Sequence, residues 1–235
     1  MKASLSAVAI VVCYVTTSCA AAFVEDQSNT IFMDGRRGPG LGANMQYTPA
    51  QVVTAGVAGR LAKIDLGVHR GTNPTGPLYV DIARTVAGQF PDFTASGRLA
   101  TRVIAEPDVP SAPPFKVFNL TLDFSADRLH FSTGDKFAIV LRSEQLHSYY
   151  GWWLNTDVSN SYVDGGAYTW DANAGNVIEQ QYDTQFRTWV AIPEPRAIAA
   201  AAVGLIGLIV ARRVLALSRR PRVAAAPSER PISRK

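Results

Sequence analysis

The chain has 235 residues, of which 47% are hydrophobic and 18% are charged, and this balance excludes a disordered or fibrous polymer. The net charge of +4 is uneven: residues 23–192 hold 13 basic and 17 acidic side chains, whereas residues 193–235 hold 9 and 2. A fold that binds nucleic acid needs a basic surface of its own, so nucleic acid is not an expected partner.

The N-terminal segment, residues 1–22, has the three parts of a secretory signal peptide. Lys2 supplies a positive charge, residues 7–15 form an apolar run, and small residues follow as far as Ala22. We predict cleavage after Ala22, which leaves Phe23 as the first residue of the mature protein. The chain is therefore expected to be exported.

Two alternatives to a cleaved signal peptide are a short membrane anchor and a lipoprotein modified at Cys19. The apolar run is too short for an anchor, and Thr16 stands where a lipoprotein signal has an aliphatic residue. Cys13 and Cys19 are the only cysteines in the sequence. Cleavage therefore predicts a mature protein without disulfides, zinc-thiolate sites or a cysteine nucleophile.

A second apolar segment, residues 197–211, has no charged side chain and predicts a transmembrane helix. It covers only about 22 Å of a roughly 30 Å hydrocarbon layer, so Arg212 and Arg213 are expected to reach the interface as its basic membrane flank. The arginine-rich end marks the cytoplasmic side, and residues 214–235 are expected to be a disordered tail. The alternative is a buried helix of the globular domain, which the arginines do not suit.

The residues before this helix are Pro193, Glu194 and Pro195. The motif, the apolar helix and the arginines in this order resemble the PEP-CTERM sorting signal, over residues 193–213. In that family an exosortase, a membrane processing enzyme of Gram-negative bacteria that export exopolysaccharide, recognises the tail. The resemblance implies processing at the Pro-Glu-Pro motif, passage through the inner membrane, and delivery to the cell envelope or the extracellular space.

Residues 23–192 contain short runs of alternating apolar and polar residues, separated by Gly, Pro, Asn and Asp, and no amphipathic helix. In residues 60–70, for example, Ile64 and Leu66 fall on one face while Lys63 and Asp65 fall on the other. Nine strands are predicted, at residues 51–54, 60–70, 78–82, 98–105, 115–123, 136–142, 149–154, 167–171 and 186–192. They predict an all-β fold, an antiparallel and jelly-roll-like β-sandwich.

The strand predicted at residues 136–142 does not alternate, so it is expected at the centre of a sheet, buried on both faces. The body resembles the β-sandwich modules that often precede such sorting tails, through residues 54–66, 134–141, 162–168 and 183–190. That resemblance implies a fold and a surface location but no activity.

No catalytic constellation stands out in the body. His69, His130 and His147 lie in separate segments without metal-ligand spacing, and there is no nucleophile elbow or phosphate-binding glycine loop. We therefore expect a non-enzymatic protein without catalytic residues. The alternative is a secreted carbohydrate-active enzyme, because its pair of carboxylates is defined by distance in space and not by sequence.

Aromatic residues concentrate at Tyr150, Trp152 and Trp153, and with Trp170 they are candidate glycan-binding residues. Alternation along a strand sends Tyr150 and Trp152 to one face and Trp153 to the other. At least half of the cluster is therefore expected in the core, and a glycan platform is the alternative. The expected function is an exported matrix or adhesion component with carbohydrate-binding capacity and exopolysaccharide as a partner.

The oxygen-rich residues 171–176 resemble the start of a calcium loop. Tyr182 stands where an EF-hand needs Glu, so that loop is excluded. An ordinary Asx turn is expected, with a structural calcium as the alternative, and no other metal or cofactor is predicted.

Overall fold

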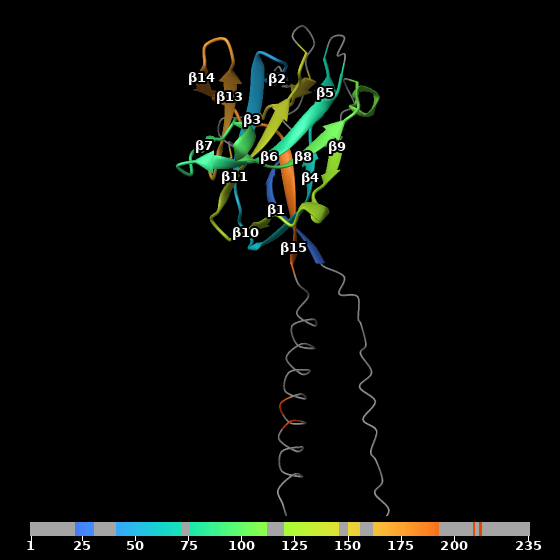
Figure 1. Cartoon of the computed structure of the whole chain (residues 1–235), viewed down its shortest axis with the longest axis vertical. Helices are drawn as coiled ribbons and strands as arrows, with labels where there is room; N and C mark the ends of the chain where they lie inside the picture. Colours follow the sequence, from blue (N-terminus) through green and yellow to red (C-terminus); the bar gives the residue numbers. More distant parts are fainter. Residues whose placement is uncertain are drawn as a thin grey trace, which may run out of the picture. The chain divides into compact units, whose positions relative to one another are not determined.

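The computed structural model describes residues 22–30, 41–71, 76–111, 120–145, 150–155 and 162–192, together with Ile209 and Arg212 (Figure 1). Ala21–Ile192 forms one compact unit. Its described regular structure is strand, apart from the short 3-10 turns η1 (Ala95–Gly97), η2 (Glu106–Asp108) and η3 (Ser125–Asp127). The all-β class predicted from the sequence is confirmed.

Outside this unit, Ile209 and Arg212 are helical and exposed. Within the part of the chain that the structure describes, no helix has the length and apolar character that crossing a membrane requires. The predicted processing motif Pro193, Glu194 and Pro195, the flanking Arg213 and most of residues 197–211 lie outside the described residues.

The strands form three sheets in which all paired strands run antiparallel. The five-stranded sheet contains β1 (Ala22–Asn29), β4 (Gly59–Leu66), β9 (Leu120–Asp123), β10 (His130–Phe131) and β15 (Phe186–Ile192). The seven-stranded sheet contains β3 (Tyr47–Thr54), β6 (Leu78–Val86), β7 (Phe90–Pro91), β8 (Arg98–Ile104), β11 (Lys136–Arg142), β13 (Gly166–Asp171) and β14 (Asn176–Glu179). The three-stranded sheet contains β2 (Leu41–Ala43), β5 (Val68–Arg70) and β12 (Tyr150–Trp152).

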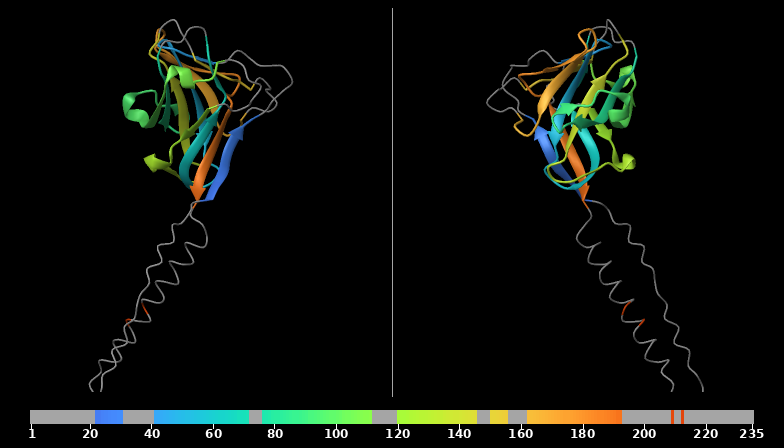
Figure 2. Two further views of the ribbon diagram at one scale, coloured as in Figure 1. Left: turned by 90° about the vertical axis from the view of Figure 1, so that its right-hand side faces the viewer. Right: turned by 60° about the vertical axis from the view of Figure 1, so that its left-hand side comes forward.

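The main hydrophobic core takes side chains from all three sheets. Ile64 of the five-stranded sheet, Val80 and Ile139 of the seven-stranded sheet, and Trp152 of the three-stranded sheet are all fully buried in it. The arrangement is β-sandwich-like, because the sheets bury one face each against a shared core. Figure 2 shows the first and last strands, β1 and β15, side by side in blue and orange, as their antiparallel pairing requires.

Several predicted strands have the observed bounds or close to them. β11 and β15 match residues 136–142 and 186–192, and β11 lies between β3 and β6 with both faces buried, as predicted. The strand predicted at residues 60–70 is wrong in one respect, because it divides at Gly67 into β4 and β5, which belong to different sheets. Of residues 115–123, the structure describes 120–123, which form β9. β1, β2, β7, β10 and β14 were not predicted from the sequence.

Candidate functional site

The seven-stranded sheet has a second apolar cluster on the face turned away from the main core. Its buried members are Ala50, Val52, Ala83, Ala138, Val140 and Tyr168. Three of them are alanines, which leave room above the sheet, and the half-buried ring of Phe93 packs against the cluster. We call this side of the seven-stranded sheet the outer face.

The ring of Phe93 reaches the outer face because a tight hairpin joins β6 to β7. The turn has two residues with positive φ, Ala87 at 52° and Gly88 at 68°, and the N–H of Gln89 donates to the carbonyl of Val86 at 3.1 Å. These are the features of a type I′ turn, whose twist suits paired strands. The chain then lies beside β6, where the N–H of Asp92 donates to the carbonyl of Arg84 at 2.9 Å.

A pocket of about 270 Å³ opens between this hairpin and β13. It is lined by Val52, Gln89, Phe90, Lys136, Val163, Gly165, Tyr168 and Glu179. Phe90 and Tyr168 meet edge to face, with ring centroids 5.6 Å apart and planes at 78°. The Tyr168 ring also lies over Gly166, where an added Cβ would stand 3.2 Å from the Tyr168 hydroxyl. The pocket therefore has two aromatic rings in its lining, one of which lies over a glycine next to the pocket.

The polar groups of the pocket stand on its rim. Gln89, Lys136 and Glu179 are exposed, and they bring an amide, an ammonium and a carboxylate to one opening. Burial raises the pKa of the Tyr168 hydroxyl, as do the negative charges of Glu179 and Asp183, so this hydroxyl keeps its proton at neutral pH. Apolar walls with a few polar groups at the edge are the usual composition of a small-molecule site.

A buried polar network fixes the wall that carries Val163 and Gly165. The carboxylate of Asp183 accepts hydrogen bonds from the backbone N–H of Tyr162 at 2.8 Å and from the Gln51 side chain at 2.9 Å. Burial raises the pKa of Asp183, and these two hydrogen bonds offset only part of that effect. At Gly165 the backbone approaches Val52 so closely that a Cβ would collide with the Val52 carbonyl oxygen.

The predicted aromatic candidates do not form one platform. Tyr150 and Trp152 are 0% exposed in the main core, where Trp152 Nε1 donates to the Gln185 carbonyl at 2.8 Å. A ring without exposed surface has no face for a sugar, so these two residues are structural. Trp153 is half-buried and stacks on His69, with centroids 4.4 Å apart, beside the three-stranded sheet.

Of the four candidates, Trp170 alone belongs to the outer face, where its ring lies 6.1 Å from that of Phe93. Phe90, Phe93 and Tyr168 were not among the residues predicted from the sequence. Tyr168 stands two residues before Trp170 in a predicted strand, so the period of two could have assigned it to the same face. Phe90 and Phe93 carry no such signal, because the hairpin that places them was not predicted.

The oxygen-rich residues 171–176 form the turn between β13 and β14. The Asp171 carboxylate accepts hydrogen bonds from the N–H groups of Asn173 and Ala174 at 2.9 and 3.2 Å, which is an Asx turn. Among the described residues there is no group of three or more His, Cys, Asp or Glu side chains that could hold a metal ion.

Comparison with known proteins finds no relative of this chain. No protein-family model matches the chain, and a search of curated proteins finds no similar sequence.

Proposed function

We propose that this chain is an exported, non-enzymatic β-sandwich protein that binds carbohydrate on the outer face of its seven-stranded sheet. The pocket lined in part by Phe90 and Tyr168 carries the proposal. Sugar rings have apolar C–H faces and a polar edge of hydroxyls, and this pocket has aromatic walls with an amide, an ammonium and a carboxylate at its rim. Its volume of about 270 Å³ suits one or two sugar rings.

The number of carboxylates in the pocket favours a binding role over hydrolysis. Glycoside hydrolases use two carboxyl groups about 5 to 10 Å apart. Glu179 is the one carboxylate among the described residues that line this pocket. The described lining of this pocket therefore offers recognition groups for a sugar and only one of the two carboxyl groups that hydrolysis would need.

The test is a glycan array probed with the full chain, followed by two matched variants. Phe90 is 42% exposed, so we expect Phe90→Ala to lower the affinity for the best array ligand at least tenfold while the chain keeps its cooperative thermal transition, with only the small loss of stability that removing the contact with Tyr168 causes. Phe23 on β1 is 58% exposed, and Phe23→Ala is expected to leave binding unchanged. An array without any ligand, or equal affinities for both variants, would contradict the proposal.

The same proposal includes sorting to the cell envelope. Its support is the signal peptide expected at residues 1–22, the Pro193, Glu194 and Pro195 motif before an apolar segment, and the arginines that follow. β15, the last strand, ends at Ile192, directly before the motif. We propose that an exosortase separates the body from the expected transmembrane helix and basic tail, which leaves the body in the envelope or the exopolysaccharide matrix with a jelly-roll-like fold.

Sorting is tested by tagging both ends of the chain in a host that contains an exosortase. The expected result is a mature body without residues 197–235, and accumulation of the full-length chain when the Pro-Glu-Pro motif is replaced with alanines. A mature protein that keeps its C-terminal tag in both cases would show that the motif is not a processing signal.

A further inference from the structure

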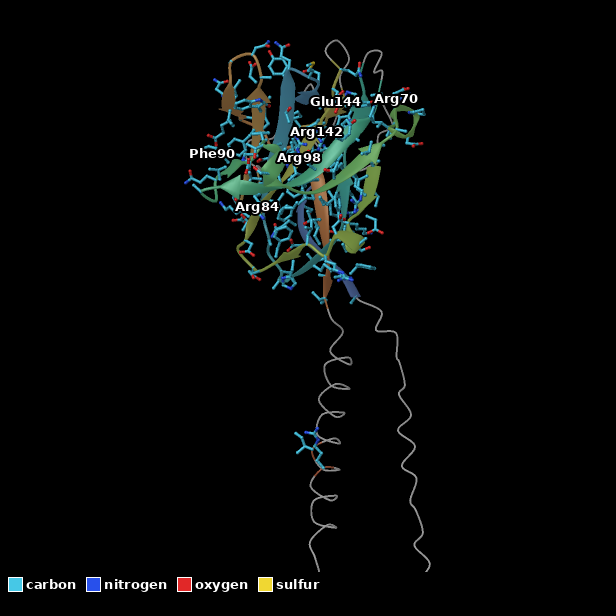
Figure 3. All side chains as sticks on the ribbon, viewed as in Figure 1. Arg70, Arg84, Phe90, Arg98, Arg142 and Glu144 are labelled. Carbon is cyan, nitrogen blue, oxygen red and sulfur yellow. The ribbon has the colours of Figure 1, made fainter. Side chains whose placement is uncertain are left out.

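A charged cluster lies on the outer face, away from the pocket. Asp81 on β6 is 1% exposed, and its carboxylate accepts a hydrogen bond from the Thr101 hydroxyl at 2.6 Å. Arg142 donates to it from Nε at 2.5 Å and from Nη2 at 3.3 Å, and Arg98 Nε lies 3.4 Å away. Arg98 and Arg142 lie next to each other in Figure 3, with Phe90 to their side on β7.

The cluster has more positive charge and more donors than Asp81 can satisfy. Two guanidinium groups share one carboxylate, which leaves an excess charge of +1. Both Nη groups of Arg98 and Nη1 of Arg142 have no acceptor among the described residues, and the side chains are 33% and 19% exposed. These N–H groups are therefore held in place by a buried carboxylate and open to an acceptor from outside.

Planar guanidinium groups bind carboxylate, sulfate and phosphate oxygens through paired hydrogen bonds. Arg142 also lies over the Tyr79 ring, with 4.8 Å from its guanidinium carbon to the ring centroid, which restricts its movement. Two preoriented guanidiniums with unused donors are a site for an oxyanion. Glu144, two residues after Arg142 in the sequence, is exposed and carries the opposite charge.

The strand registers show how the cluster relates to the pocket. Lys136 at the pocket and Arg142 stand at opposite ends of β11, about 20 Å apart at the rise of a β-strand. Tyr168 pairs with Ala50 and Trp170 with Thr48, so Trp170 lies further toward the Arg142 end than Tyr168 does. A ligand that contacts both the pocket and the arginines must therefore be longer than one sugar ring.

We propose that Arg98 and Arg142 form a subsite for an oxyanion substituent, and that the ligand of the outer face is an acidic polysaccharide. This inference rests on the proposed carbohydrate-binding function and narrows it to a class of polymer. The shared chemistry is a carboxylate or sulfate group that accepts the unused N–H donors of the two arginines. The aromatic pocket holds a sugar ring of the same chain.

The five-stranded sheet supplies a matched control. Asp65 on β4 is 3% exposed and accepts hydrogen bonds from Thr121 at 2.6 Å, Arg187 at 3.0 Å and Trp189 Nε1 at 2.7 Å. Arg187 also lies 3.6 Å from Glu25. Here one arginine meets two carboxylates, so no positive charge is left over and no oxyanion site is expected.

The experiment measures binding of the full chain to polygalacturonate, to the same polymer with its carboxylates methyl-esterified, and to dextran sulfate. We expect at least one acidic polymer to bind tenfold or more tightly than the ester, and this difference to shrink as salt is raised. The two acidic polymers distinguish a carboxylate from a sulfate as the natural substituent.

Arg98→Gln is expected to reduce the preference for the acidic polymer below threefold while the melting temperature stays unchanged. Glu144→Gln should strengthen acidic binding, and Arg187→Gln should leave it as in the wild type. Equal binding of ester and acid, or an unchanged preference in Arg98→Gln, would overturn the oxyanion subsite.

The two proposals fail in different ways. If the oxyanion subsite alone is wrong, polymers bind without charge preference and Phe90→Ala still weakens them. If the proposed sugar pocket is wrong, Phe90→Ala does not change the affinity for any polymer. Binding that still depends on Arg98 is then non-specific electrostatic attraction of a polyanion. That result overturns the acidic-polysaccharide assignment as well.

Discussion

On the five-stranded sheet, Asp65 accepts hydrogen bonds from a threonine, an arginine and a tryptophan, whereas on the seven-stranded sheet Asp81 accepts one from a threonine and faces two arginines. The strands that carry them have the same pattern, with apolar residues on both sides of each aspartate. The difference is the third partner. The third partner of Asp65 is the neutral N–H of Trp189, so Asp65 and its one arginine partner have no net charge. The third partner of Asp81 is a second guanidinium, so this group of side chains has a net positive charge and is open to a ligand.

The aromatic side chains near Asp65 and those on the outer face of the seven-stranded sheet also differ in what covers them. Lys63 and Arg187 lie over the Trp189 ring, at 4.2 and 4.9 Å from its centroid, so the protein's own cations cover this aromatic surface. On the seven-stranded sheet, Phe90 and Trp170 pack against Tyr168 and Phe93. On the Asp65 side of the five-stranded sheet, the protein's own cations thus cover the tryptophan. The outer face of the seven-stranded sheet has one such contact, between Arg142 and Tyr79, but its other rings, Phe90 and Trp170, contact aromatic neighbours instead.

The largest expected difference between the two aspartates appears when one arginine partner of each is replaced. Arg142→Leu leaves Asp81 buried with one hydroxyl donor and a more distant guanidinium, and we expect a loss of about 3 kcal/mol in the free energy of unfolding. Arg187→Leu leaves Asp65 with Thr121 and Trp189, so its loss should be about 1.5 kcal/mol. Urea unfolding measures both.

Equal losses in the two variants would mean that a second arginine 3.4 Å away serves Asp81 as well as the Trp189 N–H serves Asp65. The two clusters would then be equivalent in stability, and the view that Asp81 depends mainly on Arg142 would be wrong.

A smaller expected effect is a difference between Trp189 and Trp170 in how their replacement changes the stability of the fold with pH. Burial alone would raise the pKa of Asp65, but hydrogen bonds from Thr121, Trp189 and Arg187 outweigh it and lower the pKa below its ordinary value of 3.8. Trp189→Phe removes one of these donors, and we expect a loss of about 1.5 kcal/mol at pH 7. A lowered pKa stabilises the folded state above pH 3.8 and stops doing so as pH falls through the lowered value, so the difference from wild type should shrink in acid.

Trp170→Phe is the control for this pH dependence. Trp170 has no hydrogen bond from its ring N–H among the described residues, so the variant should unfold at nearly the same free energy as wild type at every pH. Thermal melts between pH 3 and pH 7 make the measurement. A pH-independent loss in Trp189→Phe would show that its ring packing matters and its hydrogen bond to Asp65 does not.

These two aspartates also show what the sequence can and cannot predict. Alternation correctly predicts that Ile64 and Val80 point into the core and that Asp65 and Asp81 point away from it. It implies solvated carboxylates, yet both are buried, because arginine and threonine side chains from β15, β9, β11 and β8 cover them. Those partners come from distant parts of the chain, and no local pattern encodes the pairing.

The candidate site was predicted less well than the fold for the same reason. Trp152 and Trp153 are adjacent in the sequence, but strand pairing sends one to the main core and the other to a contact with His69. The site is instead assembled from Phe90, which a tight hairpin carries across the sheet, and Tyr168, about 80 residues later in the sequence. Only the pairing of strands brings these two rings together.

The smallest expected effect concerns backbone strain at one turn near each large sheet. Ala87, with φ of 52°, begins the hairpin that carries Phe90, and Arg128, with φ of 56°, follows η3 before β10. A non-glycine residue with positive φ is strained, and asparagine tolerates this region better than alanine or arginine does. We expect Ala87→Asn and Arg128→Asn each to stabilise the fold by about 0.5 kcal/mol.

The two variants should differ in binding. A more stable hairpin holds Phe90 against Tyr168 for a larger fraction of the time, so Ala87→Asn should strengthen glycan binding about twofold by lowering the cost of ordering the pocket. Arg128→Asn changes the five-stranded side of the molecule and should leave the affinity as it is. Calorimetric titration of both variants against the same glycan measures the difference. If the stabilised hairpin binds no better than wild type, Phe90 is already fully ordered, and the affinity is then set by the rings and rim groups alone.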